Sequence, residues 1–150
     1  TIDEFLDWSL PFLTKAAVIS GTDSEIAVVK AALPIIQERL IKLSEVPGML
    51  AFLFTEKVDL DPESVAKYLD GDAKQIIAKA LEVLTALSTW SHEAIDGALR
   101  AALIEQMGLK PRLAFSAIRV AITGSHISPP LFESMEILGR ERVLARLAAI

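Results

Sequence analysis

The 150-residue sequence contains no cysteine. This absence excludes disulfide bonds, thiol nucleophiles and cysteine-ligated zinc, and it suits a reducing compartment. Long apolar runs are also missing, because Ala31–Ile36 is cut by Pro34 and Met49–Phe54 stops at Thr55. Neither run approaches the ~20 residues of a membrane-spanning helix. The sequence starts with no basic and then apolar stretch, so it predicts no signal peptide. We therefore expect a cytoplasmic chain without a membrane partner.

A strong positive charge is absent too. The net charge of −5 argues against a general nucleic-acid binder, which is normally basic. The charge is uneven, however, with −6 over residues 1–90 and +1 over residues 91–150. Arg39 is the only arginine in the first part, and six others follow: Arg100, Arg112, Arg119, Arg140, Arg142 and Arg146. The planar fork of arginine suits phosphates and base edges. The pattern fits either a local basic face or an ordinary solvated surface balanced by acids.

Period-two alternation, the mark of β-strands, is essentially missing, whereas apolar residues recur at helical spacing. Apolar residues make up 52% of the chain, enough for a sizeable core. We predict an all-α fold of short helices, with a bend at Pro11 and an interruption at Pro34. The expected runs are 3–13, 25–43, 49–54, 62–69, 76–87, 95–106, 111–121, 131–138 and 140–147. Asp70-Gly71-Asp72 reads as a stop and predicts a seam between two lobes, 1–70 and 71–150.

Aromatic residues make up only 6% of the sequence. Most of them, including Trp8 and Phe12, fall at apolar positions of the expected helices. We expect these rings to pack in the core rather than to stack on bases. Trp90 stands at a helix junction, and we expect it to fill the joint between helices.

Residue patterns for catalysis are not found. The two histidines, His92 and His126, are far apart and lie outside any zinc-binding spacing, and the glycines form no phosphate-binding loop. The sequence therefore predicts no enzymatic activity, cofactor or metal for this chain alone. We expect His92 to be a surface residue at a helix start. For His126 an exposed loop position and an RNA contact are both open.

The most informative segment is Arg119-Val-Ala-Ile-Thr-Gly-Ser-His-Ile-Ser-Pro-Pro-Leu-Phe-Glu133. It predicts the end of one apolar helix, a turn, and the start of another helix after Pro129-Pro130. Gly139-Arg-Glu-Arg142, followed by Arg146-Leu147, lies just behind it. Two helix ends and several arginines are thus brought close together.

These motifs resemble the anticodon-binding region of bacterial glutamyl-tRNA synthetases. Weaker matches precede them in the family's order, at Gln37–Leu43, Phe52–Phe54, Thr89–Ser91 and Lys110-Pro111. The resemblance implies an all-helical, cage-like anticodon-binding domain made of two lobes. It also implies a larger parent protein, a monomeric ATP-dependent ligase for glutamate and its tRNA. Because the family's ATP-binding motifs are missing and the first residue is Thr1, we expect a fragment. ATP and Mg²⁺ would belong to the catalytic half of the same enzyme.

The resemblance also implies roles for five residues. Arg119 matches the arginine at the end of the motif helix and is the first candidate for an anticodon contact. Ser128, Pro129 and Leu131 match the loop and helix start that face the third anticodon base. Arg39 resembles the arginine that reads the wobble base.

Each role has a structural alternative. Arg119 could bridge the helix end, Pro129 could only start a helix, and Leu131 could be core. For the whole chain, the alternative function is a helical protein-interaction or regulatory domain without an RNA role. An exposed apolar groove would favour that alternative.

Overall fold

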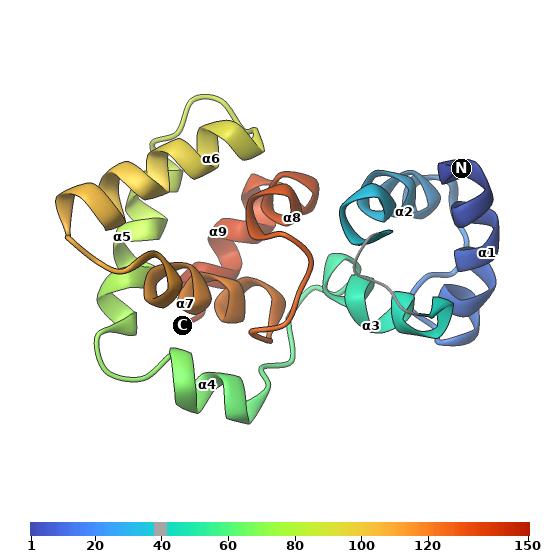
Figure 1. Cartoon of the computed structure of the whole chain (residues 1–150), viewed down its shortest axis with the longest axis horizontal. Coiled ribbons are helices and arrows are strands. Elements are labelled where there is room, and N and C mark those ends of the chain that lie inside the picture. Colours follow the sequence, from blue (N-terminus) through green and yellow to red (C-terminus); the bar gives the residue numbers. More distant parts are fainter. Residues whose placement is uncertain (38–41) are drawn as a thin grey trace. The chain divides into compact units, whose positions relative to one another are not determined.

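The computed structural model describes residues 1–37 and 42–150, which form helices joined by turns (Figure 1). No strand occurs in these two ranges, so the predicted all-α fold is confirmed. Within the same ranges, no helix combines the length and the apolar character needed to cross a bilayer. The chain divides into two compact units, Thr1–Thr55 (unit 1) and Glu56–Ile150 (unit 2).

Unit 1 is a small helical cluster around α1, which packs against α2 and α3. Its elements are α1 (Ile2–Lys15), α2 (Asp23–Ile36), η2 (Leu43–Glu45), α3 (Val46–Leu50) and η3 (Ala51–Leu53). Leu13, Leu33 and Leu50 are fully buried, one from each α-helix. Thr1 and Thr22 start α1 and α2 with capping boxes, in which a glutamate three residues later bonds back to the cap. Local capping thus sets where the two longer helices begin.

Two helix predictions for unit 1 are wrong. Helix α2 runs through Pro34, where the sequence predicted an interruption, and helix α1 likewise continues through Pro11. Buried residues lie on both sides of each proline, and their packing outweighs the ~3 kcal/mol cost of an interior proline. The helix predicted over 25–43 also does not reach its end, because Lys42 has extended backbone with φ −140° and ψ 151°.

Unit 2 is built around α7, which contacts α4, α5, α8 and α9. Its elements are α4 (Pro62–Tyr68), α5 (Ala73–Thr85), α6 (His92–Leu99), η4 (Arg100–Gln106), α7 (Pro111–Thr123), α8 (Leu131–Leu138) and α9 (Arg140–Ala148). The π-helical η4 continues directly from α6. Six residues of α7 are buried, because the helices around it cover much of its surface (Figure 1).

The division between the units falls fifteen residues before the predicted seam at 70/71. Residues 56–70 belong to unit 2 because α4 packs against α7. The backbone N–H of Asp61 donates to the carbonyl of Gly124 at 2.8 Å, which fixes the start of α4. The turn at Asp70–Asp72 therefore only separates α4 from α5. That each unit is an anticodon-binding lobe stays a prediction.

The two tryptophans lie in different environments. The indole N–H of Trp90 donates to the carbonyl of Met135 at 3.1 Å, and the guanidinium of Arg140 lies 5.4 Å from its ring centroid. The predicted joint residue is thereby confirmed. Trp8 and Phe12, in contrast, are 58% and 37% exposed, so their predicted core position is wrong. The apolar stripe of α1 is wider than the face that its neighbours cover.

Candidate nucleic-acid interface

The turn that follows α7 can be made only by glycine. Gly124 has φ 87°, in the left-handed region. A Cβ at this position would lie 2.2 Å from the carbonyl oxygen of Asp59. The close approach of the two backbone segments allows the Gly124 carbonyl to accept a hydrogen bond from the Asp61 N–H. The chain is thus pinned where the candidate loop, residues 124–130, leaves α7.

Arg119 joins the last turn of α7 to the far end of this loop. Its Nη1 donates to the Ser128 Oγ at 2.6 Å and to the Pro129 carbonyl at 2.9 Å. The Thr123 hydroxyl donates back to the Arg119 carbonyl at 2.8 Å. The bridging role that sequence left as the alternative is therefore present. A contact with RNA would have to be made by a guanidinium already held in place.

Four of the five predicted residues come together in the structure. Ser128 is 7% and Leu131 4% exposed, and Pro129 is buried as well. The Leu131 side chain therefore contributes to the core of unit 2 at the start of α8, as its alternative stated. The fifth residue, Arg39, lies outside the described residues.

The middle of the loop is fixed by a second polar network. The Ser64 hydroxyl, itself buried, lies 2.7 Å from His126 Nδ1 and donates to Asp61 Oδ2 at 2.7 Å. The His126 N–H donates to the Ser64 Oγ at 3.2 Å. The Ser64 side-chain and backbone hydrogen bonds lower the pKa of Asp61. His126 is thus an exposed loop residue held in one orientation. Sequence could not find this network, since its partners are 62 residues apart.

Two of the other arginines are internal braces rather than part of a basic face. Arg140 Nη2 donates to the Leu87 carbonyl at 2.6 Å, and Arg146 Nη1 donates to the Ile122 carbonyl at 2.8 Å. Arg146 is only 5% exposed. Its burial, together with the positive charge of Arg142, lowers its pKa to about 10. The arginine count therefore overstates the positive surface of unit 2.

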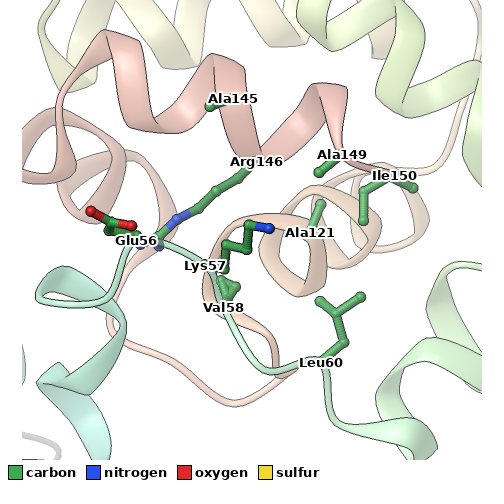
Figure 2. A pocket seen from close by; sticks show the side chains of 9 residues that line it. All are labelled: Glu56, Lys57, Val58, Leu60, Ala121, Ala145, Arg146, Ala149 and Ile150. Atoms are coloured by element: carbon green, nitrogen blue, oxygen red, sulfur yellow. The ribbon is translucent and has the colours of Figure 1, made fainter.

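Unit 2 also has a cavity away from these residues. It measures 440 Å³ and lies between the 56–60 segment, α7 and α9 (Figure 2). Arg146 extends from α9 toward Glu56, and the walls are mainly apolar, with Val58, Leu60 and Ala121 among them. None of the four described site candidates, Arg119, Ser128, Pro129 and Leu131, lines it. Among the described side chains, no group of three or more His, Asp or Glu could hold a metal ion.

The structure therefore has an all-α unit 2 in which a helix end, a turn and a new helix start follow one another, as the sequence motif predicted. The family model for the anticodon binding domain matches residues 4–150. The chain belongs to the anticodon binding domain family.

Curated relatives extend this comparison. The chain is 45% identical over 150 residues to a glutamate–tRNA ligase of Saccharopolyspora erythraea, covering 98% of this chain and 30% of that protein. It is 44% identical to the ligase of Acidothermus cellulolyticus, covering 97% of this chain and 30% of that protein. It is 52% identical over 128 residues to the ligase of Cutibacterium acnes, covering 84% of this chain and 26% of that protein. The chain thus spans less than a third of the length of these relatives.

A solved structure has the same fold. It is a crystal structure of a glutamate tRNA ligase from Elizabethkingia meningosepticum in complex with its amino acid. The TM-score is 0.80 at 17% identity, and the match covers 99% of this chain and 28% of that one. At this identity the likeness shows the fold alone.

Proposed function

We propose that this chain is the anticodon-reading part of a glutamate–tRNA ligase, and that it binds the anticodon loop of glutamate tRNA. The parent would be a cytoplasmic, monomeric class I aminoacyl-tRNA synthetase. Its catalytic half, outside this chain, would bind ATP with Mg²⁺ and glutamate. In this proposal the chain itself binds RNA and catalyses nothing. The observation that carries the proposal is the loop 124–130, which Arg119 holds at its far end and Ser64 holds at its middle.

The chemistry of the loop is compatible with this role. Single-stranded RNA is read by stacking and by hydrogen bonds to base edges, which require groups held in a fixed position. The bonds from Arg119 to Ser128 and Pro129 supply that fixed position before RNA arrives. Arg119 remains our first candidate for a hydrogen bond to an anticodon base or its backbone. Ser128, Pro129 and Leu131 remain candidates for the part that faces the third anticodon base, and Arg39 for the wobble base. Because Leu131 is buried, we assign it to holding the start of α8 rather than to stacking.

The test is a titration, at fixed salt, of the chain with the anticodon stem-loop of glutamate tRNA and with a loop carrying an altered third base. We expect tighter binding to the cognate loop. Arg119→Ala should reduce the difference between the two loops by ~1–3 kcal/mol, the range for a good base contact. Arg119→Lys keeps the charge but loses the fork, so it should also reduce the difference.

A matched control is Arg140→Ala. It removes an arginine that braces a carbonyl elsewhere in unit 2, and it should lower stability without changing the preference between loops. Equal or undetectable binding of both loops by the wild-type chain would contradict the proposed function. A preference that survives Arg119→Ala would contradict the assignment of Arg119 alone.

A further inference from the structure

In the exposed middle of loop 124–130, His126 lies beside Tyr68, in a group of side chains that the anticodon assignment does not use. We call this group the Tyr68 surface, and its members are Lys67, Tyr68, Arg112, His126 and Ile127. Lys67 Nζ lies 5.3 Å from the centroid of the Tyr68 ring. The Tyr68 and His126 rings lie 5.4 Å apart, tilted by 38°. Helix α4, the first turn of α7 and the loop thus converge on one tyrosine.

Positive charge is concentrated around the Tyr68 hydroxyl. The neighbouring cations Lys67 and, to a smaller extent, Arg112 lower the pKa of this phenol. Both cations are exposed, in contrast to the bracing arginines Arg140 and Arg146. They are therefore available to an anionic partner in a way that much of the arginine-rich end is not.

The residue that follows His126 in the loop displays an apolar side chain. Ile127 is 70% exposed, the highest value among the large hydrophobic residues that the structure describes. The Ile127 N–H donates to the Ser125 Oγ at 3.1 Å. The Thr123 hydroxyl donates to the Ser125 carbonyl and accepts from the Ser125 N–H. A loop fixed by so many hydrogen bonds does not expose isoleucine through disorder. The exposed side chain is a built feature of the surface.

Two cations, a phenol hydroxyl, an imidazole held by Ser64 and an exposed apolar group match a single-stranded nucleotide. Phosphate is recognised by lysine and arginine, and a base by a ring or an apolar face. We propose that the Tyr68 surface is a second RNA contact of this chain, in which Lys67 and Arg112 bind the phosphodiester backbone. His126 and Ile127 contact a neighbouring base without reading its identity. The inference rests on the proposed function and adds a contact to it.

Such a contact has a measurable property that base reading lacks. A bound phosphate releases counterions, so the logarithm of the binding constant falls with the logarithm of salt concentration by ~0.7 per contact on a single strand. Contacts to phosphate carry no sequence information. The Tyr68 surface should therefore strengthen binding to cognate and altered anticodon loops equally.

The experiment measures the affinity of the full chain for glutamate tRNA across a salt series, with the cognate and the altered third base. The variants are Lys67→Gln/Arg112→Gln together, Ile127→Ser, and the matched control Lys74→Gln, an exposed lysine on α5. We expect the double variant to show a salt slope shallower by about 1.4 and an unchanged preference between the two tRNAs. Ile127→Ser should bind both about tenfold more weakly. The control should keep the wild-type slope and affinity. Ile127 and both cations are exposed, so these variants should fold, which circular dichroism checks.

The outcomes separate the two proposals. Suppose that the wild-type chain prefers the cognate tRNA but the double variant keeps the wild-type salt slope. That result overturns the proposed RNA contact at the Tyr68 surface and leaves the proposed function standing. Affinity unchanged by Ile127→Ser overturns the base contact. A wild-type chain that binds neither tRNA overturns both. A variant that loses preference between the tRNAs shows base reading, which also contradicts the backbone contact proposed here.

Discussion

Unit 1 and unit 2 are both helical, but they are held together by different kinds of contact. The capping bonds described for unit 1 join residues within five positions of each other, and its exposed Lys30–Asp3 ion pair of 3.1 Å is of a weak kind. In unit 2, side chains bridge residues that are far apart in sequence, such as Ser64 with His126 and Trp90 with Met135. Apolar packing and local caps suffice to build a helical cluster. Long-range polar bridges add something else, because they fix a loop between helices in one conformation.

The largest expected effect is that of Gly124→Ala in unit 2. The new Cβ would meet the Asp59 carbonyl, and φ 87° is strained for alanine. We expect a loss of about 3–4 kcal/mol from strain, displacement of the 59–61 segment and weakening of its hydrogen bond. Chemical denaturation measures this loss.

The matched variant in unit 1 is Gly21→Ala. Gly21 also has positive φ, 102°, but nothing lies within 4 Å of the point where its Cβ would stand. Only the conformational cost remains, roughly 1–2 kcal/mol. Equal losses for the two variants would show that the pinned turn after α7 is no tighter than an ordinary loop, and the contrast between the units would fail at this point.

The second effect compares the two tryptophans. Trp90→Ala should lower the free energy of unfolding by about 3 kcal/mol, because it removes a half-buried ring, its bond to Met135 and the platform for Arg140. Trp8→Ala should change it by less than about 0.5 kcal/mol, since Trp8 is 58% exposed. Thermal melts of both variants provide the comparison. A larger loss for Trp8 would mean that α1 is packed more tightly than its exposure indicates.

These contrasts show what could be predicted from sequence. The all-α fold, the helix break after Thr123 and the place of Trp90 follow from local periodicity, glycine chemistry and the junction motif. The boundary between the units could not be predicted, because it depends on Ser64 and Asp61 reaching across the chain to the loop. For the same reason, sequence marked Arg119 and Ser128 as candidates but could not show that they bind each other. The exposure of Trp8 depends on how wide a face its neighbours cover, which periodicity does not encode.

A smaller effect tests the polar bridges directly. Ser64→Ala removes a buried hydroxyl that joins Asp61 to His126, and we expect a loss of ~1–2 kcal/mol. Thr22→Ala removes the cap of α2 and should cost a similar ~1 kcal/mol. Amide hydrogen exchange distinguishes the two. Ser64→Ala should increase exchange at His126, which is 62 residues from the changed position. Thr22→Ala should increase exchange only around residues 22–26. Exchange at His126 that stays slow without the Ser64 hydroxyl would show that other contacts hold the loop.

The smallest effect is a difference in pH dependence, and it compares one ionisable group from each unit. In unit 1, hydrogen bonds from the side chains of Thr22 and Ser20 lower the pKa of Glu25 from 4.5 to about 2. A lowered pKa means that the folded chain prefers the charged carboxylate. The contribution of Glu25 is therefore complete above pH 4.5 and disappears as pH falls toward about 2.

In unit 2, the hydrogen bond between His92 Nδ1 and Glu136, 2.9 Å long, raises the pKa of His92 above 6.5. As predicted, His92 stands at a helix start, where Ser91 caps α6. Its raised pKa means that the folded chain prefers the charged imidazolium, so this contribution is complete below pH 6.5 and is lost as pH rises through the folded pKa. NMR titration of both side chains measures the two windows. Glu136→Gln should lower the pKa of His92 and leave that of Glu25 unchanged. Thr22→Ala should raise the pKa of Glu25 and leave that of His92 unchanged. If either variant shifted both values, the two groups would be coupled, and the separation between a locally capped unit 1 and a bridged unit 2 would not hold.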